Sequence, residues 1–284
     1  MEDIIKVQVD NLTFDCRTAG NKDHQLVVLL HGFPETSYMW KHLMADLSEQ
    51  GFYCVAPNMR GFSKDACPKG KKHYRLELLA NDITGIAKAL GKSKFHLIGH
   101  DWGAAVGWKV VYDNQDMILS WIGISVPHIQ AFGEAIVKDK EQNKMSQYIR
   151  AFQWPWLPER RLMKNDLKLL RKLWKHSEPD EVEDYLSVFR NKPQLTAALN
   201  YYRANYKLLK KAAKTQVLGE IHVPTLFIWG NKDIAIGPVG VNNGHQYIKG
   251  DYTFLELDAG HWLIQTNYQD LKEAIEMHLG KHGD

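Results

Sequence analysis

The stretch FHLIGHDWG at residues 95–103 decides the fold of this chain. It starts as a short apolar run and continues directly into residues 103–113, where the apolar positions have helical spacing. Gly99 and Gly103 stand two positions before and two positions after Asp101. Residues this small allow a sharp turn from a strand into a helix, and such a turn holds the central side chain clear of the backbone. The stretch therefore predicts Asp101 as a candidate nucleophile at the end of a strand.

Strands and helices alternate on both sides of this turn. Short apolar runs bounded by glycine or proline predict buried strands at residues 27–31, 52–57, 95–100 and 120–126. Helical spacing of apolar residues predicts helices at 37–49, 76–90 and 103–113. This alternation implies a parallel sheet with helices on both faces. Two more strands, near residues 4–9 and 12–18, are predicted to form an antiparallel hairpin at one edge because a polar turn separates them.

The strand pattern stops after Pro127 and resumes at residues 225–230. The stretch between them, residues 130–215, contains no convincing strand and is rich in Lys, Leu, Glu, Trp and Tyr. We therefore expect an all-helical insertion there. A further strand at residues 252–258 and a helix at 268–279 complete the pattern.

The length of 284 residues exceeds that of a single domain of about 150 residues, and the insertion accounts for the excess. We expect an α/β core at residues 1–129 and 216–284, and a helical cap domain, or lid, at residues 130–215. The charge is also uneven, because residues 128–219 hold 18 basic and 10 acidic residues, a net +8. We expect solvated basic helix faces in the cap, and the alternative is a docking surface for an acidic partner or a membrane.

Composition excludes several classes of protein. The net charge of +3 is too small to indicate nucleic-acid binding, and the longest aliphatic runs are far shorter than the ~20 residues of a membrane span. Three cysteines cannot all pair, and no cationic and then apolar leader follows Met1, so we expect a cytoplasmic protein. We expect no metal or other cofactor, because metal-binding spacings and phosphate-binding glycine loops are absent. A homodimer is compatible with the sequence.

The aspartate at position 101 determines the type of reaction that this turn can support. A serine needs a base to become a nucleophile, whereas a carboxylate with an ordinary pKa of about 3.9 is already ionised at neutral pH. The ester that it would form must be hydrolysed by a separately activated water molecule. A histidine base and an acidic partner are therefore expected, and Asp233 and His261 follow the last two predicted strands in that order.

The sequence HGFP at residues 31–34 follows the strand at 27–31. Backbone N–H groups that point at a developing negative oxygen stabilise the transition state of ester hydrolysis. We expect this oxyanion hole to consist of the amides of Phe33 and Trp102, with Pro34 fixing the loop.

These motifs resemble those of the α/β-hydrolase-fold epoxide hydrolases over nearly the whole chain. The resemblance rests on HGFPE at 31–35, on AP-N-M-RG-F at 56–62, on GHDWG, on the Asp of GNKD and on GHW. It implies a mostly parallel, eight-stranded α/β hydrolase fold with a helical cap. It also implies hydrolysis of an epoxide to a vicinal diol through a covalent ester on Asp101, with a role in detoxification. The expected substrates are a small, largely apolar epoxide and water.

The resemblance also assigns two tyrosines in the cap. YIRAFQWP at 148–155 is similar to the motif of the first tyrosine and implies Tyr148, and LNYYRANY at 199–206 is similar to the second and implies Tyr202. Tyrosine hydroxyls donate at neutral pH, as protonation of an epoxide oxygen requires. The alternative is that both rings only fill the core of the cap.

Aromatic residues near these positions are expected to line an apolar pocket, and they are Phe33, Trp102, Phe152 and Trp262. We expect Trp154 and Trp156 to pack the cap against the core instead, and His128 is left outside the site.

Three alternatives to epoxide hydrolysis remain. A haloalkane dehalogenase resembles this chain in its aspartate nucleophile, but Phe33 stands where many dehalogenases have an asparagine to bind the halide. A serine esterase is disfavoured because position 101 is aspartate. A binding protein without activity on the same fold is the alternative from a different class, but such a protein need not keep Asp101, Asp233 and His261 together.

Overall fold

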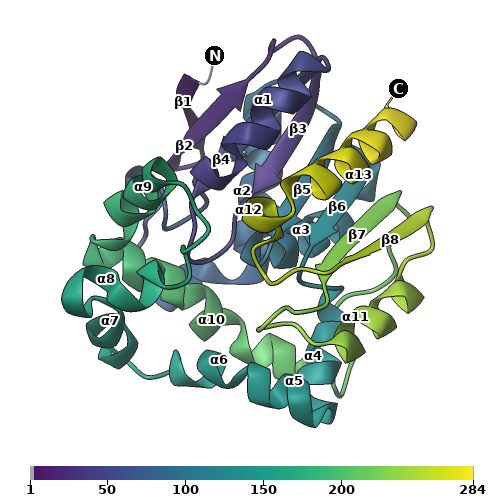
Figure 1. The fold of residues 1–284 in the computed structure, drawn as a ribbon. Coiled ribbons are helices and arrows are strands. Elements are labelled where there is room, and N and C mark those ends of the chain that lie inside the picture. The colour runs from purple at the N-terminus through teal and green to yellow at the C-terminus, as the bar shows by residue number, and fades with distance from the viewer. Residues whose placement is uncertain (1–2, 284) are drawn as a thin grey trace.

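The computed structural model describes residues 3–283 and contains one eight-stranded sheet, shown in Figure 1. The strands are β1 (Asp3–Val9), β2 (Leu12–Ala19), β3 (Gln25–Leu30), β4 (Phe52–Pro57), β5 (Phe95–His100), β6 (Ile118–Ile124), β7 (Thr225–Gly230) and β8 (Tyr252–Leu257). Their spatial order is β1-β2-β4-β3-β5-β6-β7-β8. The pairs β1–β2 and β2–β4 are antiparallel and all the others are parallel, which confirms the predicted edge hairpin and the mostly parallel sheet.

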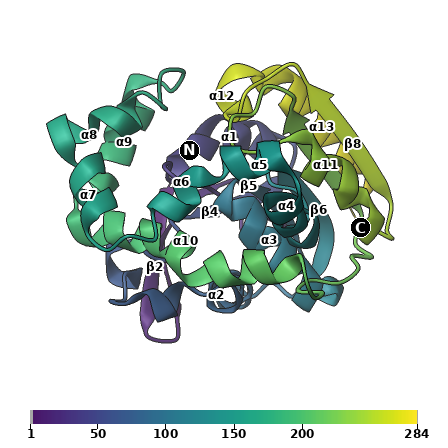
Figure 2. The same cartoon turned by 90° about the horizontal axis from the view of Figure 1, so that it is seen from below.

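The central strands are buried on both faces, as their unbroken apolar runs predict. Every residue of β5 and of β7 is buried, and so is every residue of β3 after Gln25. Helices α1 (Lys41–Glu49) and α13 (Tyr268–Lys281) cover one face, and α2 (Leu76–Ala89) and α3 (Trp102–Asp113) cover the other (Figure 2). Two short helices, α11 (Pro238–Gly244) and α12 (Leu263–Thr266), follow β7 and β8.

The segment between β6 and β7 is helical, which confirms the expected insertion. Its helices are α4 (Ile129–Lys138), α5 (Lys140–Met145), α6 (Gln147–Ala151), α7 (Leu157–Leu162), α8 (Lys164–Arg171), α9 (Pro179–Phe189) and α10 (Lys192–Ala212). They lie across one end of the sheet in Figure 1. That they form a separate domain with boundaries at residues 130 and 215 stays a prediction.

Ion pairs connect α9 to the core. Arg17 of β2 lies 2.5 Å from Asp184, and Lys41 at the start of α1 lies 2.5 Å from Glu178 and 2.7 Å from Asp180. The side chains of Arg17 and Lys41 are only 10% and 12% exposed, so their charges are less screened than those of a surface pair. The acidic start of α9 thereby balances two nearly buried cations of the core.

Two negative findings concern the part of the chain that the structure describes. No helix among residues 3–283 is both long and apolar enough to cross a membrane. Nor do three His, Cys, Asp or Glu residues within that range come close enough to hold a metal ion. Cys16, Cys54 and Cys67 are all free thiols.

Helix α3 packs unusually close to the sheet at Gly103. A Cβ atom there would lie 2.0 Å from the carbonyl oxygen of Leu30 in β3, and a Cβ atom on Gly99 would lie 2.5 Å from the carbonyl oxygen of Gly103. Both contacts involve backbone atoms, which cannot rotate away. The two glycines on either side of Asp101 are therefore required by packing.

Replacing Gly103 with Ala should lower the free energy of unfolding by about 3 kcal/mol, because the added methyl group overpacks a rigid backbone contact. Denaturant unfolding measures the change. Gly280→Ala is the matched control, since nothing lies within 4 Å of the added Cβ in α13. It should leave stability unchanged or raise it by up to about 1 kcal/mol, through better helix propensity. Equal effects of the two substitutions would contradict the packing argument.

Candidate active site

Asp101 occupies the sharp turn between β5 and α3 that the glycine pattern predicts. Its backbone has φ 51° and ψ −116°, a conformation that a residue with a Cβ rarely adopts. The turn brings the carboxylate to the carboxyl edge of the sheet, where the residue is only 7% exposed. The Asp101 carbonyl oxygen accepts the first backbone hydrogen bond of α3, from Ala105, so the helix anchors the strained residue.

The loop after β3 meets the Asp101 carboxylate. The Phe33 amide donates a hydrogen bond of 2.8 Å to Asp101 Oδ1, and the Phe33–Pro34 peptide bond is cis. Buried His31 supports the loop by accepting a hydrogen bond from the Met59 amide. Burial lowers the pKa of His31 to about 4, so it is neutral and can accept this bond. The Phe33 amide thus lies where the predicted oxyanion hole requires it. The role of the Trp102 amide in that oxyanion hole stays a prediction, because the described hydrogen bonds to the carboxylate do not include it.

Asp233 and His261, which follow β7 and β8, lie beside Asp101. His261 Nδ1 lies 2.8 Å from Asp233 Oδ2, and His261 Nε2 lies 3.6 Å from Asp101 Oδ2. The other oxygen of Asp233 accepts hydrogen bonds from the amides of Ala235 (2.7 Å) and Ile236 (3.0 Å). The structure thus brings together Asp101, Asp233 and His261, which the sequence connects only through their order along the chain.

The two carboxylates control the charge of the histidine between them. Burial alone lowers the pKa of His261, but Asp233 and Asp101 raise it more, so the pKa lies well above its ordinary value. Burial likewise raises the pKa of Asp233, but His261, the Ala235 amide and the Ser125 hydroxyl lower it further, and the net shift is downward. The resting site therefore holds an imidazolium between two carboxylates.

Ser125 is a member of this network that sequence reasoning missed. It follows β6, has φ 71°, and donates a 2.8 Å hydrogen bond to Asp233 Oδ2, with its oxygen 3.0 Å from His261 Nδ1. Its only signal in the sequence is its position directly after a buried parallel strand, at the same sheet edge as the other three residues.

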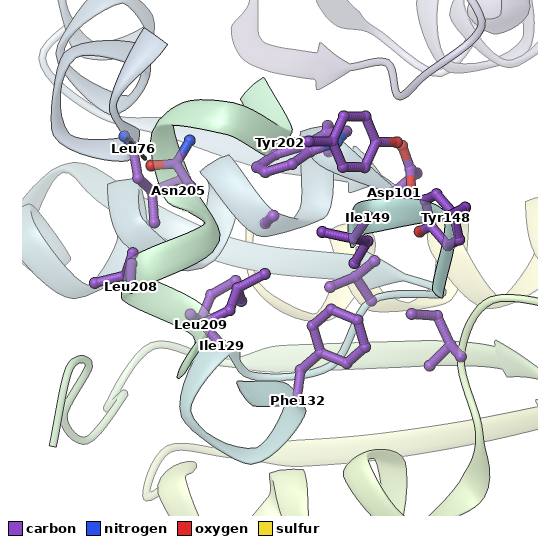
Figure 3. A pocket seen from close by; sticks show the side chains of 14 residues that line it. Leu76, Asp101, Ile129, Phe132, Tyr148, Ile149, Tyr202, Asn205, Leu208 and Leu209 are labelled. Carbon is purple, nitrogen blue, oxygen red and sulfur yellow. Dashed lines mark hydrogen bonds between the residues drawn. The ribbon is translucent and has the colours of Figure 1, made fainter. Parts of the chain in front are cut away.

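Tyr148 of α6 and Tyr202 of α10 reach the same place from the cap. Their ring centroids lie 5.8 Å apart, and Figure 3 shows both hydroxyls on the side of the pocket where Asp101 lies. Burial, and next the negative charge of Asp101, raise the pKa of each hydroxyl well above its ordinary value. Both tyrosines are therefore protonated at neutral pH and can donate.

Two pockets meet at Asp101, Tyr148 and Tyr202. One has about 830 Å³ of empty space, part of it open to solvent, and its walls include Phe33, Phe152, His261 and Trp262. The other, drawn in Figure 3, has about 500 Å³ on the same measure, and its walls include Trp102, Ile129, Phe132 and Leu209. The four predicted aromatic wall residues are thus divided between two mainly apolar pockets that share one polar centre.

The expected roles of Trp154 and Trp156 are wrong. Their side chains are 65% and 62% exposed, so they do not pack the cap against the core. The backbone of Trp156 is left-handed, with φ 52° and ψ −24°, and this turn directs the chain along the surface. Trp174 is the buried cap indole instead, and it donates a 2.8 Å hydrogen bond to the Pro34 carbonyl. His128 is buried, accepts from the Gln130 amide at the start of α4, and lines neither pocket.

Comparison with known proteins agrees with this geometry. A profile described as alpha/beta hydrolase fold matches residues 25–268. Human epoxide hydrolase 4 is 31% identical over 92% of this chain and 74% of its own length. The chain belongs to the α/β-hydrolase-fold epoxide hydrolase family. Another member, epoxide hydrolase 3 of Xenopus tropicalis, is 29% identical over 95% of this chain and 76% of its own length.

Solved structures of epoxide hydrolases superpose on nearly the whole chain. One, from work on novel epoxide hydrolases in metagenomes from hot environments, has a TM-score of 0.87 at 28% identity and covers 98% of this chain and 99% of its own. The epoxide hydrolase of Bacillus megaterium in complex with an inhibitor has a TM-score of 0.88 at 25% identity, with coverages of 97% and 100%. The fold of this family member therefore has experimentally determined counterparts.

The position of His261 between two carboxylates predicts a pH-dependent effect of Asp101→Asn. The substitution removes one carboxylate and should lower the pKa of His261. A raised pKa stabilises the folded protein below the ordinary histidine pKa, and this stabilisation is lost as pH rises through the folded value. Asp101→Asn should therefore reduce the free energy of unfolding more at about pH 5 than at about pH 9.

Imidazole ¹⁵N NMR measures the pKa directly, and denaturant unfolding at both pH values measures its effect on stability. Asp258→Asn is the matched control, because Asp258 precedes His261 by three residues but its side chain is 73% exposed and pairs with Lys232. It should leave the pKa of His261 unchanged. An unchanged pKa in Asp101→Asn would contradict the electrostatic account.

Proposed function

We propose that this protein hydrolyses epoxides to vicinal diols in two steps through an ester on Asp101. The observation that supports this most directly is the convergence of a carboxylate and two protonated tyrosine hydroxyls where two mainly apolar pockets meet, with His261 beside the carboxylate. An epoxide needs a nucleophile at carbon and a proton donor at oxygen, and this centre offers both.

In the first step, the Asp101 carboxylate attacks one ring carbon. A carbon–oxygen bond of the ring breaks, and its electron pair stays on the former epoxide oxygen. Tyr148 or Tyr202 gives that oxygen a proton, because an alkoxide is more basic than a tyrosinate even with the raised pKa of these residues. The products are an ester on Asp101, a new hydroxyl group and one tyrosinate.

The first step prepares the second. Esterification removes the negative charge of Asp101, which is one of the two charges that raise the pKa of His261. The pKa of His261 then falls, and the imidazolium can release the proton that restores the tyrosine. Neutral His261, still hydrogen-bonded to Asp233, can now accept a proton from water.

Water then attacks the carbonyl carbon of the ester. The negative oxygen that develops is held by the Phe33 amide, which already donates to Asp101 Oδ1, and in our proposal also by the Trp102 amide. Collapse of this intermediate breaks the ester bond, and His261 returns its proton to the departing diol oxygen. Asp101 is released as a carboxylic acid, and transfer of its proton to His261 restores the carboxylate and the imidazolium.

The two pockets suggest the class of substrate. They share Asp101, Tyr148 and Tyr202 but have otherwise different walls, which consist mainly of Leu, Ile, Phe and Trp side chains. We expect a largely apolar epoxide whose substituents occupy one or both pockets, with water as the second substrate.

His261→Gln should leave the first step intact and block the second. Incubation with styrene oxide should then increase the mass of the protein by that of one epoxide, located on the Asp101 peptide by mass spectrometry. The wild-type protein is the control and should not accumulate this adduct, because its ester is hydrolysed. The absence of any adduct on Asp101 in the variant would refute the covalent mechanism.

Tyr148→Phe and Tyr202→Phe should each slow ester formation by about 10- to 100-fold, and the double variant by about 10⁴-fold, as expected for loss of a proton donor. Stopped-flow tryptophan fluorescence measures this step. Tyr201→Phe is the matched control, because the neighbouring Tyr201 hydroxyl donates to the Arg60 carbonyl instead of facing Asp101. A haloalkane dehalogenase would behave differently: it would release halide from bromoalkanes, and the double variant would retain that activity.

A further inference from the structure

The cap carries a group of exposed apolar side chains that its fold does not require. Trp154, Trp156, Leu157 and Leu169 are 65%, 62%, 48% and 38% exposed, and Ile234 of the core is 63% exposed. We call these five residues the rim patch. Single exposed apolar residues are ordinary on a protein surface, but a group that includes two indoles marks an interaction site.

Four of the five rim-patch residues line pockets that reach the candidate active site. Trp154, Leu157 and Leu169 line a surface cavity that also reaches Tyr148 and Phe152. Leu169 and Ile234 line the larger of the two pockets that contain Asp101. The connection between α6 and α7, which carries both indoles, runs along the outer edge of the molecule in Figure 1. Any surface that covers the rim patch therefore also faces the pocket entrance.

The backbone at the rim patch supports a role in presenting these side chains. Trp156 is left-handed, which is unfavourable for a residue with a Cβ and a bulky ring. The turn exposes Trp156 and Leu157 at the start of α7 while the following Pro158 is buried. The segment thus combines a strained backbone with the exposure of two large apolar side chains, and neither of these features stabilises the isolated fold.

The segment that carries four of the five rim-patch residues is basic, and its Arg161 lines the same surface cavity as Trp154 and Leu157. Residues 154–175 contain seven Lys and Arg and two Asp and Glu, a net charge of +5. Both acidic residues are already neutralised, because Glu159 pairs with Arg203, and Asp166 pairs with Arg171 and Arg190. Six of the cations form no salt bridge with any acidic residue that the structure describes: Arg160, Arg161, Lys164, Lys168, Lys172 and Lys175. Positive charge is thus left free beside the exposed apolar groups.

This combination matches an anionic lipid surface. Indole rings favour the level of the lipid headgroups, aliphatic side chains enter the acyl boundary, and each Lys or Arg near an anionic membrane contributes to binding. An acidic protein partner would match the charge, but it would also cover the pocket entrance. A bilayer dissolves apolar molecules, so apolar substrate could still reach the pocket entrance while the protein is in contact with the lipid.

We propose that the rim patch and its basic surroundings dock this protein reversibly on anionic lipid bilayers, with the pocket entrance facing the lipid. Apolar substrate can then pass from the bilayer into the pocket without crossing water. The docking itself is independent of the proposed reaction, because the rim patch contains none of the proposed reacting groups.

Co-sedimentation of the full chain with lipid vesicles tests this proposal. We expect binding to vesicles of phosphatidylcholine mixed with phosphatidylglycerol, much weaker binding to pure phosphatidylcholine, and a loss of binding as salt increases. Trp154→Ala/Trp156→Ala and Arg160→Glu/Arg161→Glu should each weaken binding about tenfold or more. Both variants should turn over a small water-soluble epoxide at the wild-type rate.

Charge reversal elsewhere provides the matched control. Lys22 and Lys94 are exposed and stand before β3 and β5, at the opposite end of the sheet from Asp101. Lys22→Glu/Lys94→Glu makes the same change in net charge and should bind like the wild type. Equal loss in this control, equal binding to neutral vesicles, or no binding at low salt would overturn the proposal. Vesicle binding by a protein that turns over no epoxide would refute the proposed function and leave the docking proposal intact.

Discussion

The turn at Asp101 is the constraint on which the rest of the structure depends. Its strained backbone is held between the loop after β3 and the start of α3, with so little space that a Cβ atom on Gly32 would lie 2.4 Å from Asp101 Cβ. This close packing fixes the carboxylate at the sheet edge, where it accepts a hydrogen bond from the Phe33 amide. The neighbouring strands β6, β7 and β8 end at the same edge, and so Ser125, Asp233 and His261 meet it there.

The core and the cap contribute different chemistry to one centre. The core supplies charges, namely two carboxylates with an imidazolium between them, whereas the cap supplies the neutral donors Tyr148 and Tyr202. The two sets are coupled, because the negative charge of Asp101 both raises the pKa of His261 and helps keep the tyrosines protonated. A change in the charge of Asp101 therefore affects every other ionisable group of the site.

The sequence predicts this core well, since the fold and Asp101 both follow from local rules on glycine spacing and apolar runs. The tyrosines depended on resemblance to a family, because nothing in the spacing of aromatic residues separates a proton donor from core filling. Ser125 was missed because a serine after a buried strand has no distinguishing pattern. The prediction for Trp154 and Trp156 was wrong because their apolar character predicts burial, whereas both are exposed. The left-handed turn at Trp156 could not be predicted, because the usual sequence signal for such a turn is a glycine and none is present there.

The hydrogen bond between Ser125 and Asp233 joins residues 108 positions apart, and the whole cap lies in the loop that it closes. The entropy of closing a loop grows only with the logarithm of its length, so doubling this loop would cost only about 0.6 kcal/mol more. Insertions and deletions between α4 and α10 should therefore destabilise the folded core far less than changes within a strand would. The cap is the part of this chain in which evolution can most easily change pocket shape while the charge network below it stays the same.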